Sequence, residues 1–394
     1  MDLEHLSENA KIKGLGLLGT GDFTHPKWFA ELKNKLKPVP GDLFEFGGIK
    51  WMLTSEVSTV YPQGGKIRKI HHILHAPSFE IVEQINELLA SYGDLSSDGR
   101  PTLSISSPEL VEKLLELSKE IFIVSAHAWT PWFSVFGSKS GFDSMEECYQ
   151  DQIKNIYAIE TGLSSDPPMN WRLSSLDRFA LLSNSDSHSP NIWRIGRECN
   201  AFELEKETYF EIWDAIKKKD SKRFKFTIEV DPAYGKYHFD GHRNCNVSLS
   251  PAESKKYGEK CPVCRKSLTL GVLHRVEELA DRPEGFVPEN AIPFKRLLPL
   301  YELISATMDI NSLYSKKVVE FQNKLLKLGS ELDLLLFVSK EKIEEIAGKK
   351  IADLVIKNRT GALTVSPGYD GVYGKLLLDK EEKIEKEQKT LNEF

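Results

Sequence analysis

Acidic residues and histidines recur at the ends of apolar runs in the first half of the chain. The run LLSNSDSHSP at 181–190 contains Asp186 and His188, whose side chains would leave a strand on the same side because strand side chains alternate with a period of two. A carboxylate and an imidazole displayed together could hold a metal ion. They could equally belong to an ordinary polar loop, and the tripeptide alone leaves both interpretations open.

Six short apolar runs share this arrangement, and we expect each of them to form a strand. They cover residues 15–20, 50–58, 69–76, 120–128, 156–162 and 179–186. Loop or helical sequence follows each run, which predicts a parallel β/α architecture with chemistry at the carboxyl ends of the strands. The polar residues that we expect to converge there on one pocket are Asp22, Glu56, His72, His127, Glu160, Asp186 and His188.

So many ionisable groups in one pocket indicate bound cations, since unpaired buried charges cost several kcal/mol each. Mixed nitrogen and oxygen ligands suit Zn²⁺, Mn²⁺ or Fe²⁺ better than Mg²⁺ or Ca²⁺. Glu56 could bridge two such ions, which would activate water and neutralise charge on a phosphate. The predicted reaction is therefore hydrolysis of a phosphate ester, with Glu56, Asp186 and His188 as catalytic residues.

Several other histidines are interpreted as structural. His71 precedes His72 and would face the opposite side of its strand. His5 and His75 lack an evident partner for a metal site. His25, in the segment GDFTHP, remains open between a metal ligand and a structural residue.

A second set of residues has the spacing of a structural zinc site. Two residues separate His242 from Cys245, two separate Cys261 from Cys264, and fifteen residues join the two pairs. Four such ligands suit tetrahedral Zn²⁺ and leave no open position for catalysis. A redox role for the CPVC segment would not explain the first pair.

The composition is typical of a soluble globular protein. The chain has 394 residues, 40% hydrophobic and 28% charged, with a formal net charge of −6. No run approaches the ~20 apolar residues of a membrane span and the N-terminus does not resemble a signal peptide, so we expect a cytoplasmic protein. Two of the five cysteines, Cys148 and Cys199, lie outside the zinc set and are expected to be buried and unreactive.

Taken together, the segments resemble the PHP-type metallophosphoesterases and, more narrowly, the endonuclease Q family. The matching segments are GTGDFTHP, TSEVST, HHILHAPS, SAHAWTPWF, MNWRLSSLD and SNSDSHS, with the zinc module included. The resemblance implies a distorted β/α barrel with two or three divalent metals (Zn²⁺, Mn²⁺ or Mg²⁺), besides the structural Zn²⁺. It also implies an enzyme that nicks damaged DNA on the 5′ side of uracil, hypoxanthine, xanthine or abasic sites.

The same resemblance assigns roles to individual residues. Glu56 would be the bridging carboxylate. The residues that it implies as ligands of the barrel metals are Asp22 or His25, Glu56, His72, His127, Asp186 and His188. The family's first strand carries a His-x-His pair, whereas this sequence begins at MDLEHLSENAKIKG, which matches the next helix. Either the protein lacks two ligands and is feebly active, or its start lies upstream; we expect the second, because a missing strand exposes unpaired edges.

Three parts are expected along the chain. Residues 1–228 would form the PHP-type barrel without its first strand, 229–288 the zinc module, and 289–394 a mainly helical region with the Gly- and Tyr-rich turn segment NRTGALTVSPGYDGVYGKL.

Contact with DNA requires local basic patches, since the net charge is negative. The candidates, most of them in the run KKKDSKRFKF, are Lys217, Lys218, Lys219, Lys222, Arg223 and, as a stacking platform, Tyr369. The runs KIRK at 66–69 and SKKYGEK at 254–260 are weaker candidates, and all these residues could equally be ordinary surface or turn positions. The candidate walls of a lesion pocket are Trp129, Trp132, Trp171 and Trp193.

Two other classes of function compete with the lesion-specific endonuclease. A PHP-type phosphatase for a small phosphomonoester would have no use for the zinc module and the helical region. A non-catalytic DNA-binding or helicase-like protein is the third class, although no segment matches the phosphate-binding loop G-x-x-x-x-G-K-[ST]. The sequence does not indicate the metals' identity, the preferred lesion or the replication and repair proteins that the chain meets.

Overall fold

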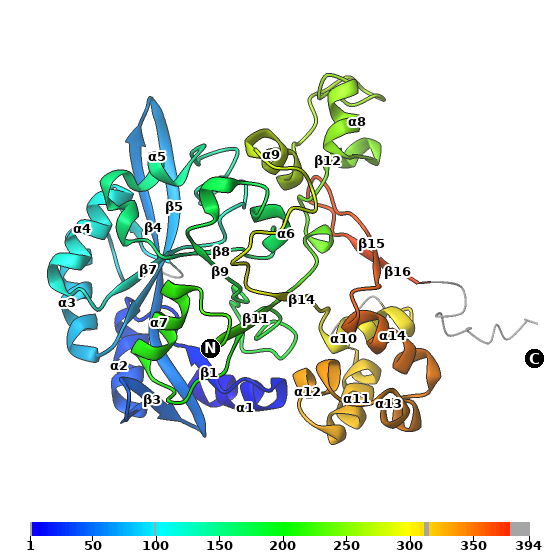
Figure 1. Cartoon of the computed structure of the whole chain (residues 1–394), viewed down its shortest axis with the longest axis horizontal. Coiled ribbons are helices and arrows are strands. Elements are labelled where there is room, and N and C mark those ends of the chain that lie inside the picture. Colours follow the sequence, from blue (N-terminus) through cyan, green and yellow to red (C-terminus); the bar gives the residue numbers. More distant parts are fainter. Residues whose placement is uncertain (1, 98–99, 311–314, 379–394) are drawn as a thin grey trace, which may run out of the picture.

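The computed structural model describes residues 2–97, 100–310 and 315–378, and its largest part is a curled, mixed sheet flanked by helices (Figure 1). The strands of this sheet are β1 (Leu17–Gly19), β2 (Lys37–Val39), β3 (Leu43–Phe46), β4 (Ile49–Gln63), β5 (Lys66–Ala76), β6 (Thr102–Leu103), β7 (Phe122–Ser125), β8 (Ala158–Glu160) and β9 (Ala180–Leu182). The α/β class and the distorted barrel are confirmed.

Strand direction departs from the expected parallel pattern in one half of the sheet. The order is β2-β3-β4-β5-β7-β8-β9, with β1 and β6 beside β4. Strands β7, β8 and β9 are parallel, but β4 and β5 form a long antiparallel hairpin, and β5 is also antiparallel to β7. Gly64 and Gly65 make the hairpin turn, with φ of 62° and 72°, because a two-residue turn that matches the strand twist needs positive φ.

Helices cover the outer face of the curled sheet with their apolar sides. They are α1 (Leu3–Lys13), α2 (Pro26–Lys35), α3 (Phe79–Ala90), α4 (Ser107–Leu117), α5 (Met145–Tyr149) and α7 (Tyr209–Lys218), whereas the single-turn α6 (Pro167–Asn170) packs against α9 (Val272–Leu279). Helix α1 is the one expected at the N-terminus: Asp2 caps it by accepting from the backbone N–H of His5, and Gly14 ends it with φ of 96°. His5 is therefore a structural residue, as expected.

A smaller sheet joins the barrel to the zinc module. Its strands are β10 (Cys199–Phe202), β11 (Phe224–Glu229) and β14 (Phe294–Arg296). The zinc module, which projects from the molecule in Figure 1, contains β12 (Asp240–His242), β13 (Val247–Leu249), α8 (Pro251–Lys256) and α9 (Val272–Leu279). Short 3-10 turns lie at Gln150–Asn155, Ser174–Leu176, Pro232–Tyr234, Arg243–Cys245 and Leu326–Leu328.

The last part of the described chain is a helical cluster with its own apolar core. Its elements are α10 (Leu300–Thr307), α11 (Lys316–Leu325), α12 (Glu331–Leu336), α13 (Lys340–Ala347), α14 (Lys349–Arg359) and the hairpin β15 (Thr364–Ser366) and β16 (Lys375–Leu377). A buried ion pair of 2.8 Å between Lys13 and Glu331 ties this cluster to α1.

Contacts cross both of the boundaries expected near residues 228 and 288. Strand β14 pairs with β11 of the small sheet, and Tyr369 donates a hydrogen bond to Asn246 in the zinc module. The division into three independent parts stays a prediction. Among the described residues, no helix is long and apolar enough to cross a membrane.

Candidate metal centres

Strand register brings three ligand groups together at the carboxyl end of β7. Glu56 on β4 and His71 on β5 lie on one face of the hairpin, because Glu56 is opposite Ile73 and His71 is opposite Ser58. The carboxylate Oε1 of Glu56 lies 2.8 Å from Nδ1 of His71 and 3.2 Å from Nε2 of His127. We call Glu56, His71 and His127 the barrel cluster; their ligand atoms all lie within 4.8 Å of one another.

The expectation that His72 points into the pocket and His71 away from it is wrong. His72 is fully buried on the other face of β5, where its ring nitrogens lie 3.0 Å from the hydroxyl of Thr59 and 2.9 Å from that of Tyr149. The prediction that His71 and His72 face opposite sides of β5 is correct, but strand alternation does not indicate which of the two sides faces the pocket. Packing of α4 and α5 against the His72 face decides that.

The other expected residues surround the barrel cluster. Asp186 lies 3.1 Å from Nε2 of His188 and acts electrostatically on His127. Asp22 is electrostatically coupled to Glu56 and His188, and His25 is close enough to stabilise the charge of Asp22. The carboxylate of Glu160 accepts a 2.7 Å hydrogen bond from the backbone N–H of His127.

Three of these residues have strained backbone conformations. Asp22, His127 and Asp186 have φ of 37°, 25° and 41°, a region that residues other than glycine rarely occupy. Each lies in the loop that follows a strand, after β1, β7 and β9 respectively. Gly162 permits the turn at His127, because a Cβ there would lie 2.6 Å from the Cβ of His127. Such strain is typical of sites where function constrains geometry.

Burial and close contact separate the protonation states of the barrel cluster. Burial opposes the ionisation of Glu56, but hydrogen bonds with His127 and His71 outweigh it and lower its pKa well below the usual value. Burial lowers the pKa of His71 to about 4, so this ring is neutral at pH 7. Burial would also lower the pKa of His127, but Glu56 reverses the shift and raises it to about 9. The cluster thus contains an ionised carboxylate, a neutral imidazole and an imidazolium.

Arg100 is a site residue that the sequence analysis missed. Its Nη1 lies 2.8 Å from Oε1 of Glu56, and its Nη2 lies 3.5 Å from Nε2 of His188. No motif marks this arginine, because it reaches the site from a loop between α3 and β6. It places a cation among the carboxylates of Glu56, Asp22 and Asp186.

Supporting groups orient His127. The hydroxyl of Thr130 lies 3.0 Å from Nδ1 of His127, which leaves Nε2 directed at Glu56. Burial raises the pKa of Glu160 to about 7, and its carboxylate fixes the backbone of His127. A histidine that is held through one ring nitrogen and offers the other is the usual arrangement of a metal ligand.

The barrel cluster fits a divalent cation by its donor chemistry. One ionised carboxylate and two imidazoles are a donor set suited to Zn²⁺ or Mn²⁺. The guanidinium of Arg100, 2.8 Å from Oε1 of Glu56, shows that this carboxylate accommodates a cationic partner. Metal binding would require His127 to lose its proton, since only the neutral ring binds a metal.

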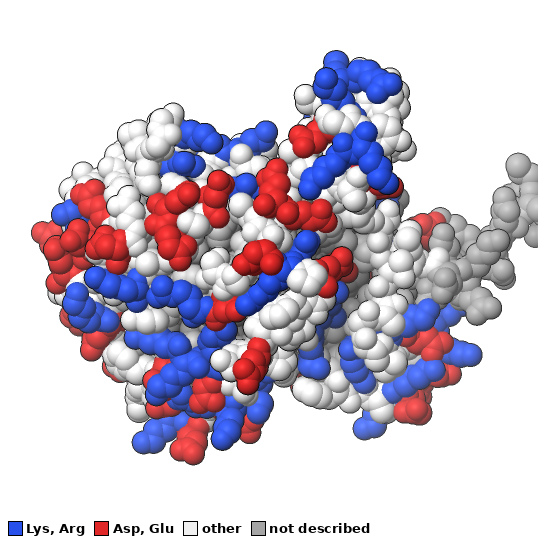
Figure 2. Space-filling view, turned by 45° about the horizontal axis from the view of Figure 1, so that its top comes forward, with Lys and Arg blue, Asp and Glu red and all other residues white. Residues whose placement is uncertain are grey.

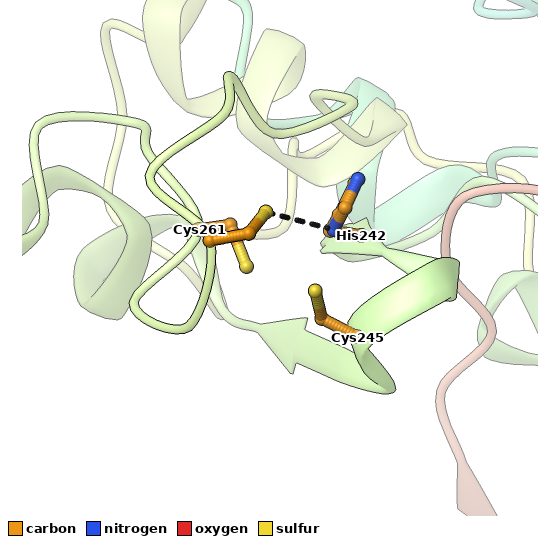
Figure 3. Close-up of side chains that lie close together, drawn as sticks. His242, Cys245 and Cys261 are labelled. Carbon is orange, nitrogen blue, oxygen red and sulfur yellow. Dashed lines mark hydrogen bonds between the residues drawn. The ribbon is translucent and has the colours of Figure 1, made fainter.

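The zinc module brings all four expected ligands together. His242, Cys245 and Cys261 point toward one another in Figure 3, and Sγ of Cys264 lies 3.5 Å from Nδ1 of His242. The ligand atoms of the four residues all lie within 4.8 Å of one another. An arrangement of one imidazole and three thiols is a donor set of structural zinc sites.

Two similar turns position these ligands. Asn246 follows Cys245 with φ of 53°, and Arg265 follows Cys264 with φ of 65°. Although burial opposes it, the backbone N–H groups of Cys264 and Val263 lower the pKa of Cys261 to about 7. The thiolate form that a metal requires is therefore accessible near neutral pH.

The remaining cysteines have the expected environment. Cys148 is fully buried and Cys199 is partly buried, and both are free thiols. Burial raises the pKa of each to about 12. Neither thiol is therefore ionised at neutral pH.

Most of the basic residues expected to bind DNA contact protein groups instead. Lys217 lies over the rings of Phe122 and Tyr157, Lys218 pairs with Asp214, and Lys219 donates to the backbone carbonyl of Asp177. The pairs of Arg223 are with Glu211, Asp214 and Asp220. DNA binding by this run, Lys222 included, stays a prediction with reduced support.

The aromatic candidates divide by exposure. Trp129 is buried and donates to Asn170, Trp171 and Trp193 are partly buried, and Trp132 is 46% exposed at the rim of the site. Tyr369 packs on Gly241 of the zinc module, which covers one side of its ring. Stacking of a base on Tyr369 stays a prediction.

Two solved structures resemble this chain over nearly its whole length. No protein-family model matches the chain. The crystal structure of the lesion-specific endonuclease PfuEndoQ from Pyrococcus furiosus is 34% identical, with a TM-score of 0.86 over 97% of this chain and 92% of that chain. A structure of endonuclease Q with a 27-mer duplex substrate, which has an abasic lesion at the active site, is also 34% identical, with a TM-score of 0.85 over 98% and 94%.

Two curated proteins of uncharacterized function also match. Protein MJ0043 of Methanocaldococcus jannaschii is 33% identical over 276 residues, which are 68% of this chain and 34% of that protein. The chain thus spans about a third of its length. Protein YqxK of Bacillus subtilis is 28% identical over 383 residues, which are 94% of this chain and 91% of that protein.

Proposed function

This chain belongs to the endonuclease Q family, and we propose that it is a metal-dependent DNA-repair endonuclease that hydrolyses the phosphodiester on the 5′ side of a damaged nucleotide. The proposed lesions are the deaminated bases uracil, hypoxanthine and xanthine, and abasic sites. The observation that carries the proposal is the likeness to a lesion-specific endonuclease, which extends over 97% of this chain. A relative of equal identity holds duplex DNA with an abasic lesion at its active site.

The barrel cluster supports a phosphodiesterase chemistry. Glu56, His71 and His127 would hold a divalent cation, proposed as Zn²⁺ or Mn²⁺, and Asp22, Asp186 and His188 would complete the set. When bound, such cations activate water and stabilise the negative charge that develops on the phosphate. The protein's own contribution is to direct Nε2 of His127 and Nδ1 of His71 at one point, with the hydroxyl of Thr130 holding the first ring.

The zinc module supports contact with duplex DNA. In Figure 2, blue basic side chains gather on the lobe that this module forms. The exposed basic residues of the module are Lys236, Arg243, Lys255, Lys256, Lys260, Arg265 and Lys266. Basic side chains in such a group bind phosphates without regard to sequence and would hold the duplex while the barrel acts on the lesion.

The proposal is tested with end-labelled duplex oligonucleotides. Each would carry a single uracil, hypoxanthine, xanthine or abasic analogue, and the matched control would be the undamaged duplex. We expect a metal-dependent nick on the 5′ side of the lesion and little cleavage of the control. Removal of metal with a chelator should stop the reaction, and added Mn²⁺ or Zn²⁺ should restore it.

The competing functions predict different outcomes. A small-molecule phosphatase would hydrolyse a phosphomonoester such as p-nitrophenyl phosphate at least as well as it nicks damaged DNA. A binding-only protein would retain lesion DNA without cleaving it under any metal. Either result would overturn the proposed endonuclease.

A further inference from the structure

The hairpin of β4 and β5 extends well beyond the barrel cluster. Its strands remain paired from Leu53–Ala76 to Gln63–Lys66, whereas the pairing of β5 with β7 reaches only from His75 to His72. The outer half of the hairpin therefore projects past the carboxyl ends of β7, β8 and β9. In Figure 1 this projection and the zinc module rise on the same side of the molecule.

Strand register shows which residues of the projection face the site. Directly opposed residues point to the same side, and the successive pairs outward from Ser58–His71 are Val60–Lys69 and Pro62–Ile67. Lys69 and Ile67 thus continue the face that carries His71. We call Pro62, Ile67 and Lys69 the site-facing strip.

Two residues of this strip, Pro62 and Ile67, are exposed, and the half-buried Lys69 connects the strip to the barrel cluster. Ile67 is 55% exposed at the start of β5, although the later part of this strand is buried in the core. The ammonium group of Lys69 lies 5.3 Å from the ring centre of Phe133, and the same ring lies 4.7 Å from the ring of His71. Phe133, whose ring contacts both Lys69 and His71, has a strained backbone with φ of 60°.

The opposite face of the projection has a structural role. Arg68 lies 4.1 Å over the ring of Phe142 and donates to the backbone carbonyls of Gln63 and Gly141. Lys66, on the same face as Arg68, is exposed at the hairpin end. The basic run at 66–69 is therefore divided by strand alternation: Lys69 faces the site and Lys66 does not.

We infer that the site-facing strip binds the DNA strand next to the cleaved bond, with Lys69 contacting a backbone phosphate and Ile67 and Pro62 packing on the adjoining sugars. The inference rests on the proposed function and names the path of its substrate. Ile67 lies four residues beyond His71, which corresponds to about 14 Å of strand, or about four base-pair steps of a duplex. Among the described residues, Lys69 forms no ion pair that would compete with a phosphate.

The test compares two lysines on opposite faces of one hairpin. Lys69→Gln and Lys66→Gln each remove one positive charge from the same hairpin. Neither lysine belongs to the buried core, so both substitutions should leave the core intact. Binding would be measured by fluorescence anisotropy with a duplex that contains a tetrahydrofuran abasic analogue, over a series of salt concentrations. Lys69→Gln should weaken binding by about 3- to 10-fold at low salt and reduce the slope of log K against log salt by about 0.9. Lys66→Gln should stay within about twofold of the parent with an unchanged slope.

A third variant examines the apolar part of the strip. Ile67→Ser should weaken binding without changing the salt slope, because it removes packing rather than charge. Metal content and the melting temperature of all three variants should match the parent. A Lys69→Gln variant that loses barrel metal would show an indirect effect through Phe133 and would overturn the inference.

The outcomes separate this inference from the proposed function. If the parent neither binds nor nicks lesion DNA, the endonuclease itself is wrong. If the parent nicks lesion DNA but Lys69→Gln keeps the parental slope, the strip does not contact the strand. Equal losses in Lys69→Gln and Lys66→Gln would indicate a diffuse positive field rather than a directed path, and would also overturn the inference.

Discussion

The zinc module combines one histidine with three cysteines and the barrel cluster combines two histidines with one glutamate, and different parts of the fold hold the two groups in place. The four candidate ligands of the module come from one continuous segment between His242 and Cys264, around which Val247, Cys261 and Leu268 form a small buried cluster. The barrel cluster takes Glu56, His71 and His127 from separate elements above a large apolar core. A small core cannot order a segment alone, so the module should depend on its metal far more than the barrel does.

The two centres also differ in how open they are. Four thiol and imidazole ligands complete a tetrahedral shell and leave no position for a substrate. The barrel cluster offers three ligands, with Asp186, His188 and Arg100 at its rim, and the side chain of His188 is 64% exposed. The difference predicts that the closed group of four holds a structural metal, whereas the open barrel cluster leaves room for a substrate.

The largest effect is expected from breaking the zinc shell. Cys261→Ser should release about one zinc per chain and unfold residues 240–265, because the metal contributes about 10–16 kcal/mol to such segments. Metal analysis and amide hydrogen exchange would measure both effects. Cys148→Ser is the matched control in the barrel and should keep the zinc. Full zinc content in Cys261→Ser would contradict the assignment.

Breaking the barrel cluster should abolish chemistry without unfolding the chain. Glu56→Gln removes the carboxylate that contacts both imidazoles and should lower the nicking rate by about 10³-fold, since ionised ligands and general bases contribute on this scale. Melting temperature should change little. Glu87→Gln on the exposed side of α3 is the matched control. Parental nicking by Glu56→Gln would remove this cluster from the mechanism.

Substitutions of the adjacent His71 and His72 should distinguish a residue of the metal site from a residue of the core. His71→Ala should lower nicking and barrel metal content by about 10- to 100-fold with nearly parental stability. His72→Ala should instead keep the metal and cost about 1–3 kcal/mol of stability, because Thr59 and Tyr149 lose a buried partner. Metal titration and chemical denaturation separate the two results. The reverse pattern would restore His72 as the ligand.

The smallest effect is expected from the buried carboxylate of Glu229 on β11. Burial, and to a smaller extent the negative charge of Asp166, raise the pKa of Glu229 above its ordinary value of about 4.3. A raised folded-state pKa gives stability that is complete below the unfolded value and is lost as pH rises through the folded one. Glu229→Gln should therefore flatten the fall in stability above pH 5 by on the order of 1–2 kcal/mol, as measured by melting temperature from pH 5 to 9. An unchanged pH profile would contradict the raised pKa.

The sequence by itself determined which four residues meet in the zinc module and most of the residues that lie around the barrel pocket. The zinc pairs were predictable because all four ligands lie in one segment, where spacing along the chain nearly equals spacing in the fold. Glu56, His127, Asp186 and His188 were placed correctly around the pocket because strand ends can be recognised from apolar runs. Their individual roles at the metals stay predictions.

Only the tertiary structure decided between His71 and His72. Alternation along β5 requires the two rings to face opposite sides, but it does not distinguish the sides. That choice depends on the antiparallel pairing with β4, whose Gly64–Gly65 turn the parallel interpretation overlooked, and on the helices that cover the His72 face. Arg100 likewise reaches Glu56 from a loop with no periodicity or motif. Contacts between distant segments depend on how the chain packs, and local residue patterns record only which contacts are sterically and chemically allowed.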